Sequence, residues 1–306
     1  MNWKQKSKLY RALSLPGGEG IYRFAQKHFT RSLIPNVGRV ESKARVALRY
    51  WQSVQRLGIE EQTKAGMHLD FGAGWHPTIP FVFHALGVRK QRLLDLVPVM
   101  DAKLLSNGLA ILKSIGPGML QSAGLSPVVD VPFPAERGTV GAILGAAGMS
   151  YDAPYGGLLS TLEKQAAFVT STQVLLHIPE PILAGCFRDI HHALQPGGVF
   201  MATVHLYPLY GGLTENSREA FEHLIYSPEE WEKFGSQIMY YQRLKASDYR
   251  RLLEVAGFKI VEWEVTDGSV ADLAMVNILP VHECFSNYPR PELAARHVYF
   301  AAQKPQ

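Results

Sequence analysis

The sequence predicts an α/β fold whose core is a mostly parallel sheet covered by helices on both faces. Two observations support this prediction. Short apolar runs typical of buried strands alternate with segments of helical periodicity from residue 67 to the C-terminus. Glycines follow the first run and an acidic residue follows the second, as in a strand–helix–strand unit. With 306 residues, 47% of them hydrophobic, the chain can bury a large core.

The boundaries of the elements follow from capping and turn residues. The segment Gln195-Pro196-Gly197-Gly198 is expected to end a helix, and Ser247 is expected to cap the next one. Residues 138–151 indicate a packed helix and turn, and residues 269–296 a loop-rich insertion. Helices are expected at 78–86, 181–194 and 247–256, and strands at 67–71, 92–96, 166–170, 199–204, 258–265 and 297–302.

The N-terminal part of the chain is strongly basic. Residues 1–60 carry 12 Lys and Arg against 3 Asp and Glu, a net charge of +9, whereas the remainder carries −5. Residues 44–57 have helical spacing of their apolar side chains. We therefore expect a basic helical extension or cap over residues 1–62 and the main domain over 63–306. The basic face is either solvated or makes weak contact with an anionic membrane surface.

Several classes of protein are disfavoured by the sequence. The basic start is followed by no apolar stretch of the kind found in a signal peptide, and no run is long enough for a membrane span. The two cysteines, Cys186 and Cys284, have no spacing that indicates a disulfide framework or a metal site. These features favour a reducing, cytoplasmic setting and no bound metal.

A glycine-rich turn carries the clearest functional signal. The run Asp70-Phe71-Gly72-Ala73-Gly74 lies between a predicted strand and a predicted helix, where glycines let the backbone approach a ligand closely. Asp95 follows Gly74 by 21 residues, at the end of the next predicted strand. A carboxylate in that position can accept hydrogen bonds from the ribose hydroxyls of a nucleoside cofactor. The pattern predicts a nucleoside site at the carboxyl ends of the strands.

The identity of the cofactor follows from the third position of the turn. A dinucleotide fingerprint would require glycine at residue 77, which is Pro77, so a nicotinamide oxidoreductase is disfavoured. The pattern acid-x-Gly-x-Gly-x-Gly, used for S-adenosylmethionine, fits Asp70, Gly72 and Gly74 and departs at His76. S-adenosylmethionine is therefore the predicted cofactor.

Residues 65–305 resemble class I S-adenosylmethionine-dependent methyltransferases. The likeness rests on the glycine turn, on Leu94-Asp95-Leu96, on Ser171-Thr172-Gln173-Val174-Leu175-Leu176-His177-Ile178-Pro179 and on the helix that runs into Leu194-Gln195-Pro196-Gly197-Gly198. It implies a Rossmann-like sheet of seven strands. Residues 226–249 resemble, more narrowly, bacterial methyltransferases found near polysaccharide-synthesis genes.

The resemblance also implies which residues surround the cofactor. Asp152 with Ala153 would lie near the adenine; in an alternative alignment Gly156 takes the place of the acid and Tyr155 stacks on the ring. Thr172 and Gln173 would border the sulfonium. The implied cofactor-binding residues are Asp70, Gly72, Ala73, Gly74, Asp95, Leu96, Asp152, Ala153, Thr172 and Gln173.

The acceptor side is less specified by the sequence. A hydroxyl acceptor needs a general base, and the candidates are His205 and His177, which follow two neighbouring strands. His177 occupies the histidine of the family's Leu-Glu-His-Ile-Pro pattern, with Leu176 in place of Glu. Tyr207, Tyr241 and Arg243 could hold a sugar or phosphate, because aromatic rings stack on sugars and guanidinium groups bind phosphate.

We therefore expect methyl transfer to a small-molecule or glycan acceptor, most simply at oxygen. Two alternatives remain open at this point: an RNA methyltransferase, favoured only by the basic arm, and a non-catalytic nucleotide-binding partner protein, suggested by His76 and Leu176. DNA is disfavoured, because neither Asn-Pro-Pro-Tyr nor Asp-Pro-Pro-Tyr follows the fourth strand.

Overall fold

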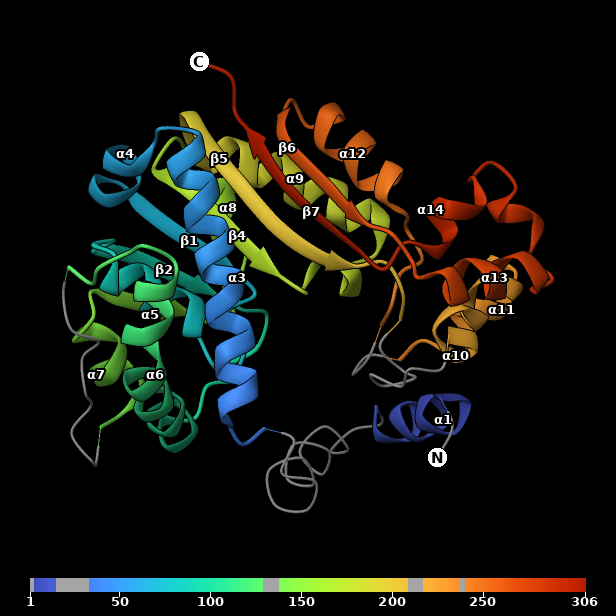
Figure 1. The fold of residues 1–306 in the computed structure, drawn as a ribbon, viewed down its shortest axis with the longest axis horizontal. Helices are drawn as coiled ribbons and strands as arrows, with labels where there is room; N and C mark the ends of the chain where they lie inside the picture. The colour runs from blue at the N-terminus through green and yellow to red at the C-terminus, as the bar shows by residue number, and fades with distance from the viewer. Residues whose placement is uncertain (1–2, 15–32, 129–137, 209–216, 237–239) are drawn as a thin grey trace.

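The computed structural model, which describes residues 3–14, 33–128, 138–208, 217–236 and 240–306, contains one seven-stranded sheet. The strand order is β3-β2-β1-β4-β5-β7-β6 (Figure 1). Strands β1 to β5 are parallel, and β7 runs antiparallel to both neighbours. The strands are β1 (Met67–Phe71), β2 (Lys90–Leu94), β3 (Met149–Asp152), β4 (Ala166–Thr172), β5 (Leu194–His205), β6 (Lys259–Thr266) and β7 (His297–Gln303). The predicted mostly parallel, seven-stranded Rossmann-like sheet is confirmed.

Helices cover both faces of this sheet, as predicted. One face carries α8 (Leu158–Thr161), α9 (Glu180–Ala193) and α12 (Ala246–Val255). The other carries α3 (Val37–Arg56), α5 (Thr78–Ala85), α6 (Ala102–Ser122) and α7 (Val140–Gly145). A short helix, α4 (Glu60–Ala65), leads into β1.

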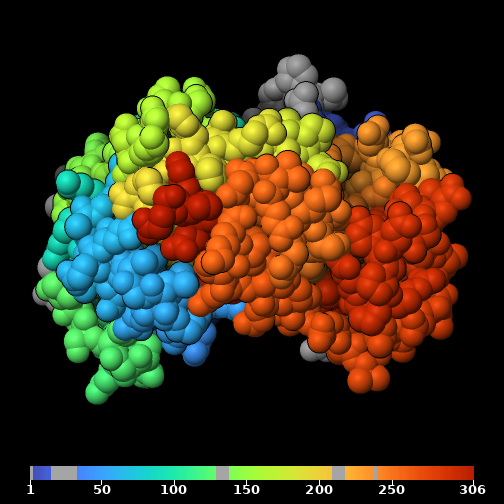
Figure 2. Space-filling model, turned by 90° about the horizontal axis from the view of Figure 1, so that it is seen from above, coloured from blue at the N-terminus to red at the C-terminus, as the bar shows by residue number. Residues whose placement is uncertain are grey.

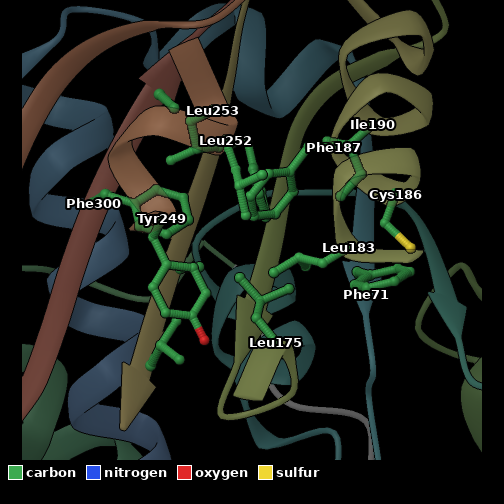
Figure 3. Close-up of a cluster of buried hydrophobic side chains, with 14 of the residues drawn as sticks. Phe71, Leu175, Leu183, Cys186, Phe187, Ile190, Tyr249, Leu252, Leu253 and Phe300 are labelled. Atoms are coloured by element: carbon green, nitrogen blue, oxygen red, sulfur yellow. The ribbon is translucent and has the colours of Figure 1, made fainter. Parts of the chain in front are cut away.

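The central strands are apolar on both faces, which explains their continuous hydrophobic runs. Successive side chains of a strand point to opposite faces. Phe168 and Met201 accordingly pack under α3 and α5, whereas Val169 and Phe200 pack under α9 and α12. Figure 3 shows part of the second core. It is formed by Phe71, Leu175, Leu183, Cys186, Phe187, Ile190, Tyr249, Leu252, Leu253 and Phe300.

Helix α3 is held firmly against the sheet although it lies in the predicted extension. The Tyr50 hydroxyl donates to the Ser171 carbonyl at 2.9 Å, and Arg56 Nε pairs with Glu262 Oε1 at 2.8 Å. Helix α3 therefore belongs to the layer that covers the sheet. The boundary expected between residues 62 and 63 falls inside α4, because this helix continues to Ala65.

A group of short helices lies in the chain segments that follow β5 and β6. It comprises α10 (Ser217–Phe221), the 3-10 turn η3 (Glu222–Ile225), α11 (Pro228–Glu232), α13 (Val270–Ile278), the 3-10 turn η4 (Glu283–Phe285) and α14 (Arg290–Ala294). The expectation of a loop-rich insertion at 269–296 was wrong, because Ser269 caps α13 in a capping box with Asp272. Figure 2 shows the C-terminal third of the chain, in orange and red, filling one side of the molecule.

Helix α1 (Trp3–Leu13) packs against this helical group (Figure 1). The Trp3 ring lies 5.8 Å from Trp231 and 4.9 Å from Phe234, and Ser7 Oγ donates to the Phe234 carbonyl at 2.7 Å. Lys4, Lys8 and Arg11 are exposed, although Lys4 also lies over the Tyr226 ring and Arg11 Nη1 donates to the Lys233 carbonyl. Part of the basic arm is therefore docked through an apolar side. None of the described helices is long and apolar enough to cross a bilayer.

Two local expectations were wrong, and a third, the packed helix and turn at 138–151, was correct for the helix and turn but missed a strand. Residues 195–198 lie inside β5, which begins at Leu194 directly after α9, so the helix ends without a separate turn. Residues 138–151 contain α7 and then most of β3, because Gly148 provides the left-handed residue between them, with φ of 67°. Lys245, not Ser247, precedes α12, and its N–H donates to Asp248 Oδ2 at 2.8 Å.

Candidate cofactor and active site

A cavity of about 530 Å³ lies at the carboxyl ends of β1, β2 and β4, where the parallel strands were expected to form a site. A smaller cavity of about 70 Å³, between α3, α5 and α6, is almost entirely apolar and lies away from these strand ends. The large cavity brings together most of the predicted cofactor residues. These are Gly72, Ala73, Gly74, Asp95, Leu96, Thr172, Gln173 and, from the catalytic candidates, His177.

The turn after β1 requires glycine at Gly72 for two separate reasons. Gly72 has a φ of 84°, a left-handed conformation that costs other residues energy. A Cβ atom there would also lie 2.3 Å from Val174 Cγ2. The Gly72 N–H donates to the Leu94 carbonyl at 2.8 Å. The turn therefore holds the ends of β1, β2 and β4 in close contact.

Asp95 is positioned by this turn. Its Oδ2 accepts hydrogen bonds from the Gly74 N–H and from the Tyr151 hydroxyl, both at 3.0 Å. Burial raises the pKa of Asp95 to about 6, although these two donors oppose the shift. Gly74, with φ of 68°, faces open space. The carboxylate lines the cavity with Oδ1 outside both of these hydrogen bonds.

Asp70 lies deeper than Asp95, at the end of β1. Its Oδ1 accepts a hydrogen bond from the Thr170 hydroxyl at 2.9 Å, and the side chain is buried. Burial raises the pKa of Asp70 to about 7, and the negative charge of Asp95 adds to this effect. Asp70 lines a small recess of about 30 Å³ behind the glycine turn, together with Lys43 and Thr172.

The structure places Asp152 and Ala153 outside the lining of the cavity. Asp152 is the last residue of β3, and its Oδ2 accepts from Arg92 Nε at 3.1 Å on the neighbouring strand. This ion pair turns the carboxylate away from the cavity. Tyr155 lines the cavity instead, with its ring 5.7 Å from Phe71 in an edge-on contact. Of the residues in the two alternative alignments, Tyr155 lines the cavity, and its place beside the adenine stays a prediction.

The segment after β4 adopts an unusual backbone conformation. Gln173 has a φ of 59°, which is rare for a residue other than glycine and typical of functional sites. Its N–H donates to the Thr203 carbonyl at 2.9 Å, and its Oε1 accepts the His205 N–H at 2.8 Å. The hydroxyl of Thr172 lies 2.9 Å from the Tyr50 hydroxyl. The strand ends of β4 and β5 and helix α3 thus fix both predicted sulfonium neighbours.

His177 lies in the cavity wall with a defined tautomer. Its Nδ1 is 2.8 Å from the Tyr240 carbonyl, and because a carbonyl can only accept, Nδ1 carries the proton. Burial lowers the pKa of His177, which favours the neutral ring. Nε2 therefore keeps a lone pair that can accept a proton.

His205 does not line the cavity, contrary to the prediction. Its ring packs against His297, with centroids 4.4 Å apart, and burial lowers the pKa of His205 to about 3. Its Nδ1 is a buried atom without a hydrogen-bond partner among the described residues. The backbone of His205 reaches the site only indirectly, through its bond to Gln173.

The three predicted substrate residues are part of the packing of the molecule. Tyr207 lies under Arg296, whose guanidinium is 5.1 Å from the ring, and Tyr241 is buried beside His177. Arg243 Nη1 donates to the Tyr226 carbonyl at 2.5 Å, and its guanidinium lies over Phe285. None of these three described side chains lines the cavity. Their role in binding the acceptor stays a prediction.

The sequence reasoning missed the contribution of helix α3 to the site. Lys43 and Arg39 line the cavity, and Lys43 Nζ donates to the His76 carbonyl at 2.8 Å. His76 Nε2 is in turn 2.7 Å from the Leu33 carbonyl. The signal was present as the spacing of Arg39 and Lys43, four residues apart and so on one face of a helix.

The family of the chain follows from a comparison with known protein families. Residues 42–263, more than half of the chain, match the family described as a methyltransferase domain. The chain belongs to this methyltransferase family. The predictions of an S-adenosylmethionine-dependent methyltransferase, and of S-adenosylmethionine as its cofactor, are confirmed. The narrower likeness to enzymes encoded near polysaccharide-synthesis genes stays a prediction.

Solved structures of low sequence identity resemble the methyltransferase. A candidate sarcosine dimethylglycine methyltransferase of Galdieria sulphuraria is 13% identical, with a TM-score of 0.45, over 85% of this chain and 86% of that one. Phosphoethanolamine N-methyltransferase 2 of Haemonchus contortus is 17% identical, with a TM-score of 0.39. There 79% of this chain aligns with 49% of the other, so it spans about half of that enzyme. No curated protein matches the sequence.

The cavity of the methyltransferase fits its cofactor. Gly72 and Val174 both line the cavity, and a side chain at Gly72 would collide with Val174 and distort this wall. The Gly74 N–H orients Asp95, whose carboxylate can accept hydrogen bonds from ribose hydroxyls. A polar floor of this kind beneath an apolar wall formed by Leu96, Val97 and Tyr155 matches a nucleoside in both shape and polarity.

Replacing Gly72 tests the close packing of the turn. Gly72→Ala adds both the left-handed strain and the contact with Val174, so we expect a loss of about 2–5 kcal/mol of unfolding free energy and no measurable cofactor binding. Gly58→Ala is the matched control, since Gly58 has a φ of 67° and open space around it. It should lose about 1–2 kcal/mol. Urea unfolding measures both; equal losses would contradict the packing argument.

Asp95→Asn tests the buried charge. The folded pKa of Asp95, about 6, lies above its ordinary value, so ionisation of Asp95 penalises the folded state. This penalty is absent below about pH 4 and complete above about pH 7. The variant should therefore gain stability relative to the wild type as the pH rises, by on the order of 1 kcal/mol. At pH 7.5 it should also bind S-adenosylhomocysteine more weakly by roughly 1.5–3 kcal/mol.

Urea unfolding at several pH values and calorimetric titration measure these two effects. Glu163→Gln, which removes an exposed carboxylate, is the control. A stability difference between wild type and Asp95→Asn that is the same at every pH would show that Asp95 is ionised without penalty. Unchanged affinity of a folded Asp95→Asn would remove Asp95 from the cofactor site.

Proposed function

We propose that the methyltransferase transfers a methyl group from S-adenosylmethionine to a hydroxyl oxygen of a small molecule or glycan, with His177 as general base. The observation that carries this proposal is the hydrogen bond between His177 Nδ1 and the Tyr240 carbonyl. It leaves an unprotonated Nε2 on a ring that lines the cavity. A hydroxyl acceptor must lose a proton, and a positioned neutral imidazole is suited to accept it.

In the same proposal, the predicted cofactor residues divide among the parts of the ligand. Asp95 accepts hydrogen bonds from the ribose hydroxyls, and Leu96 and Tyr155 flank the adenine. Thr172 and Gln173 border the sulfonium. The support for this division is that all five residues line one cavity next to the glycine turn. The bound cofactor supplies an already activated methyl group, so the protein needs mainly to align the acceptor with it.

The chain's own part in the reaction is acid–base chemistry and positioning. As the acceptor oxygen would form its bond to the methyl carbon, the bond from that carbon to the sulfonium sulfur would break, S-adenosylhomocysteine would leave, and the hydroxyl proton would pass to His177 Nε2. The Tyr240 carbonyl stabilises the resulting imidazolium through Nδ1, because a hydrogen bond to a charged donor is stronger than one to a neutral donor. The Tyr241 ring, 4.8 Å away, restrains the imidazole from the other side.

His177→Asn tests the base. The Asn amide can still donate to the Tyr240 carbonyl but offers no basic nitrogen. With S-adenosylmethionine and a panel of hydroxylated small molecules and oligosaccharides, we expect the rate to fall about 10²- to 10⁴-fold. Calorimetry should show S-adenosylhomocysteine affinity within about threefold of the wild type, a difference near RT. Release of S-adenosylhomocysteine measures the rate, and His192→Asn, at an exposed position, is the control.

Three results would change the proposal. Full activity of His177→Asn would exclude this residue as the base. Binding of S-adenosylhomocysteine without turnover on any acceptor would favour the non-catalytic partner protein. Failure of the wild type to bind S-adenosylhomocysteine, with NAD as the negative control, would remove the cofactor assignment itself.

We further propose that the methyltransferase works in the cytoplasm and contacts anionic membranes weakly through α1. The support is the arrangement of this helix: Trp3 and Ser7 hold it to the protein, while Lys4, Lys8 and Arg11 are exposed. Each basic side chain near an anionic surface contributes about 1 kcal/mol. This contact would bring the enzyme close to acceptors carried on a membrane surface.

Charge reversal on α1 tests the membrane contact. Lys4→Glu combined with Lys8→Glu should reduce sedimentation with vesicles that contain phosphatidylserine at least about tenfold, because the reversal removes two favourable charges and adds two unfavourable ones. Lys90→Glu combined with Lys259→Glu, at exposed positions on the sheet, is the control. A wild-type protein that never sediments with these vesicles would show that the basic face is only solvated.

A further inference from the structure

Lys43 is a basic residue that lines both the cofactor cavity and the small recess behind the glycine turn. It is in the second turn of α3, and its Nζ donates to the carbonyl of His76 in the loop that follows the glycine turn. The residue keeps some contact with solvent, but its ammonium end is surrounded by protein, and this burial lowers the pKa of Lys43. A lysine in such a position calls for an anionic partner.

The neighbouring carboxylates do not meet this need. Asp70 and Asp95 face Lys43 and raise its pKa, against the effect of burial. Among the described residues, however, neither carboxylate comes within ion-pair distance of Nζ. Nζ carries three protons, and one of them is donated to the His76 carbonyl. The ammonium group of Lys43 and the carboxyl groups of Asp70 and Asp95 thus lie near one another without forming ion pairs.

The position of Lys43 is rigidly defined. Helix α3 is fixed to the sheet by Tyr50, which bonds to the end of β4, and by Arg56, which pairs with Glu262 on β6. Just before the N-terminus of this helix, the Leu33 carbonyl accepts a hydrogen bond from His76 Nε2. Lys43 therefore cannot swing away from the glycine turn without moving the whole helix.

We propose that Lys43 binds the α-carboxylate of the cofactor and makes the site selective for sulfur nucleosides that carry this group. The proposal rests on the assigned cofactor, which has a nucleoside at one end and an α-amino acid at the other. Asp95 serves the nucleoside end of the cavity. The second end, between Lys43 and the buried Asp70, offers a cation to a carboxylate and an anion to an ammonium.

This arrangement also explains the departure at His76. The family pattern has a third glycine there, and in this chain the His76 carbonyl accepts from Lys43 while the ring holds Leu33. His76 thus links the glycine loop to the N-terminal segment that carries the cation. The substitution fits an added contact to the cofactor rather than a degenerate site.

Ligand pairs that differ only in the carboxylate test the proposal. The wild type, Lys43→Met and Arg45→Met are titrated calorimetrically with S-adenosylhomocysteine and with its decarboxylated analogue, which keeps the amine. Arg45 is two residues along α3 and exposed, so it is the matched control. We expect the wild type and Arg45→Met to prefer S-adenosylhomocysteine about 10- to 100-fold, as for loss of one charge-assisted hydrogen bond. Lys43→Met should bind both ligands equally weakly.

The outcomes separate this proposal from the proposed function. If Lys43→Met still prefers the carboxylate ligand as strongly as the wild type, the proposal is overturned and Arg39 becomes the candidate. If Lys43→Met does not fold, the wild-type preference and Lys43→Arg, which keeps the cation, decide the question: both should discriminate. A wild type that binds both ligands equally overturns the role of Lys43 and leaves the cofactor in place. A wild type that binds neither overturns the cofactor assignment.

Discussion

The contact between Gly72 and Val174 joins the two strand ends on which the site of this methyltransferase is built. Gly72 follows β1 and Val174 follows β4, and the backbone of Gly72 and the side chain of Val174 approach so closely that a Cβ atom on Gly72 has no room. The Gly72 N–H also bonds to Leu94 at the end of β2. Three parallel strands therefore finish at one level, and the polar groups beyond them converge. The orientation of Asp95 by Gly74 is a direct consequence.

A second consequence is that charges of both signs are gathered where water is partly excluded. Burial raises the pKa of Asp70 to about 7 and that of Asp95 to about 6, and it lowers the pKa of Lys43. Charged groups gathered in this way stabilise the fold less than apolar side chains would, because each ion has lost hydration. A zwitterionic ligand can pair with these charges. Folding stability and ligand binding are thus set against each other at the same residues.

The basic N-terminal segment has two different relations to the rest of the molecule. Helix α1 lies on the C-terminal helical group through Trp3 and keeps its lysines outside. Helix α3 lies across the sheet and turns Lys43 inward to the cofactor cavity. Basic residues of this segment are therefore exposed on α1 and line the cavity on α3. The distribution of charge along the sequence does not show which lysine is exposed and which is turned inward. The difference lies in the partner surface: an aromatic cluster in one case and the glycine loop in the other.

The sequence by itself determined the features that depend on neighbours along the chain. The strands β1, β4 and β7, the glycine turn and the position of Asp95 were predictable, because a short continuous apolar run and a glycine that allows positive φ are local properties of the chain. The tertiary structure alone decided which side chains enter the cavity. Asp152 pairs with a neighbouring strand, Arg243 is enclosed by the helical group, and Lys43 arrives from a helix that precedes the whole sheet. The order of the strands and the packing of the helices decide where these three side chains point. Neither can be inferred from the spacing of residues within one segment of the sequence.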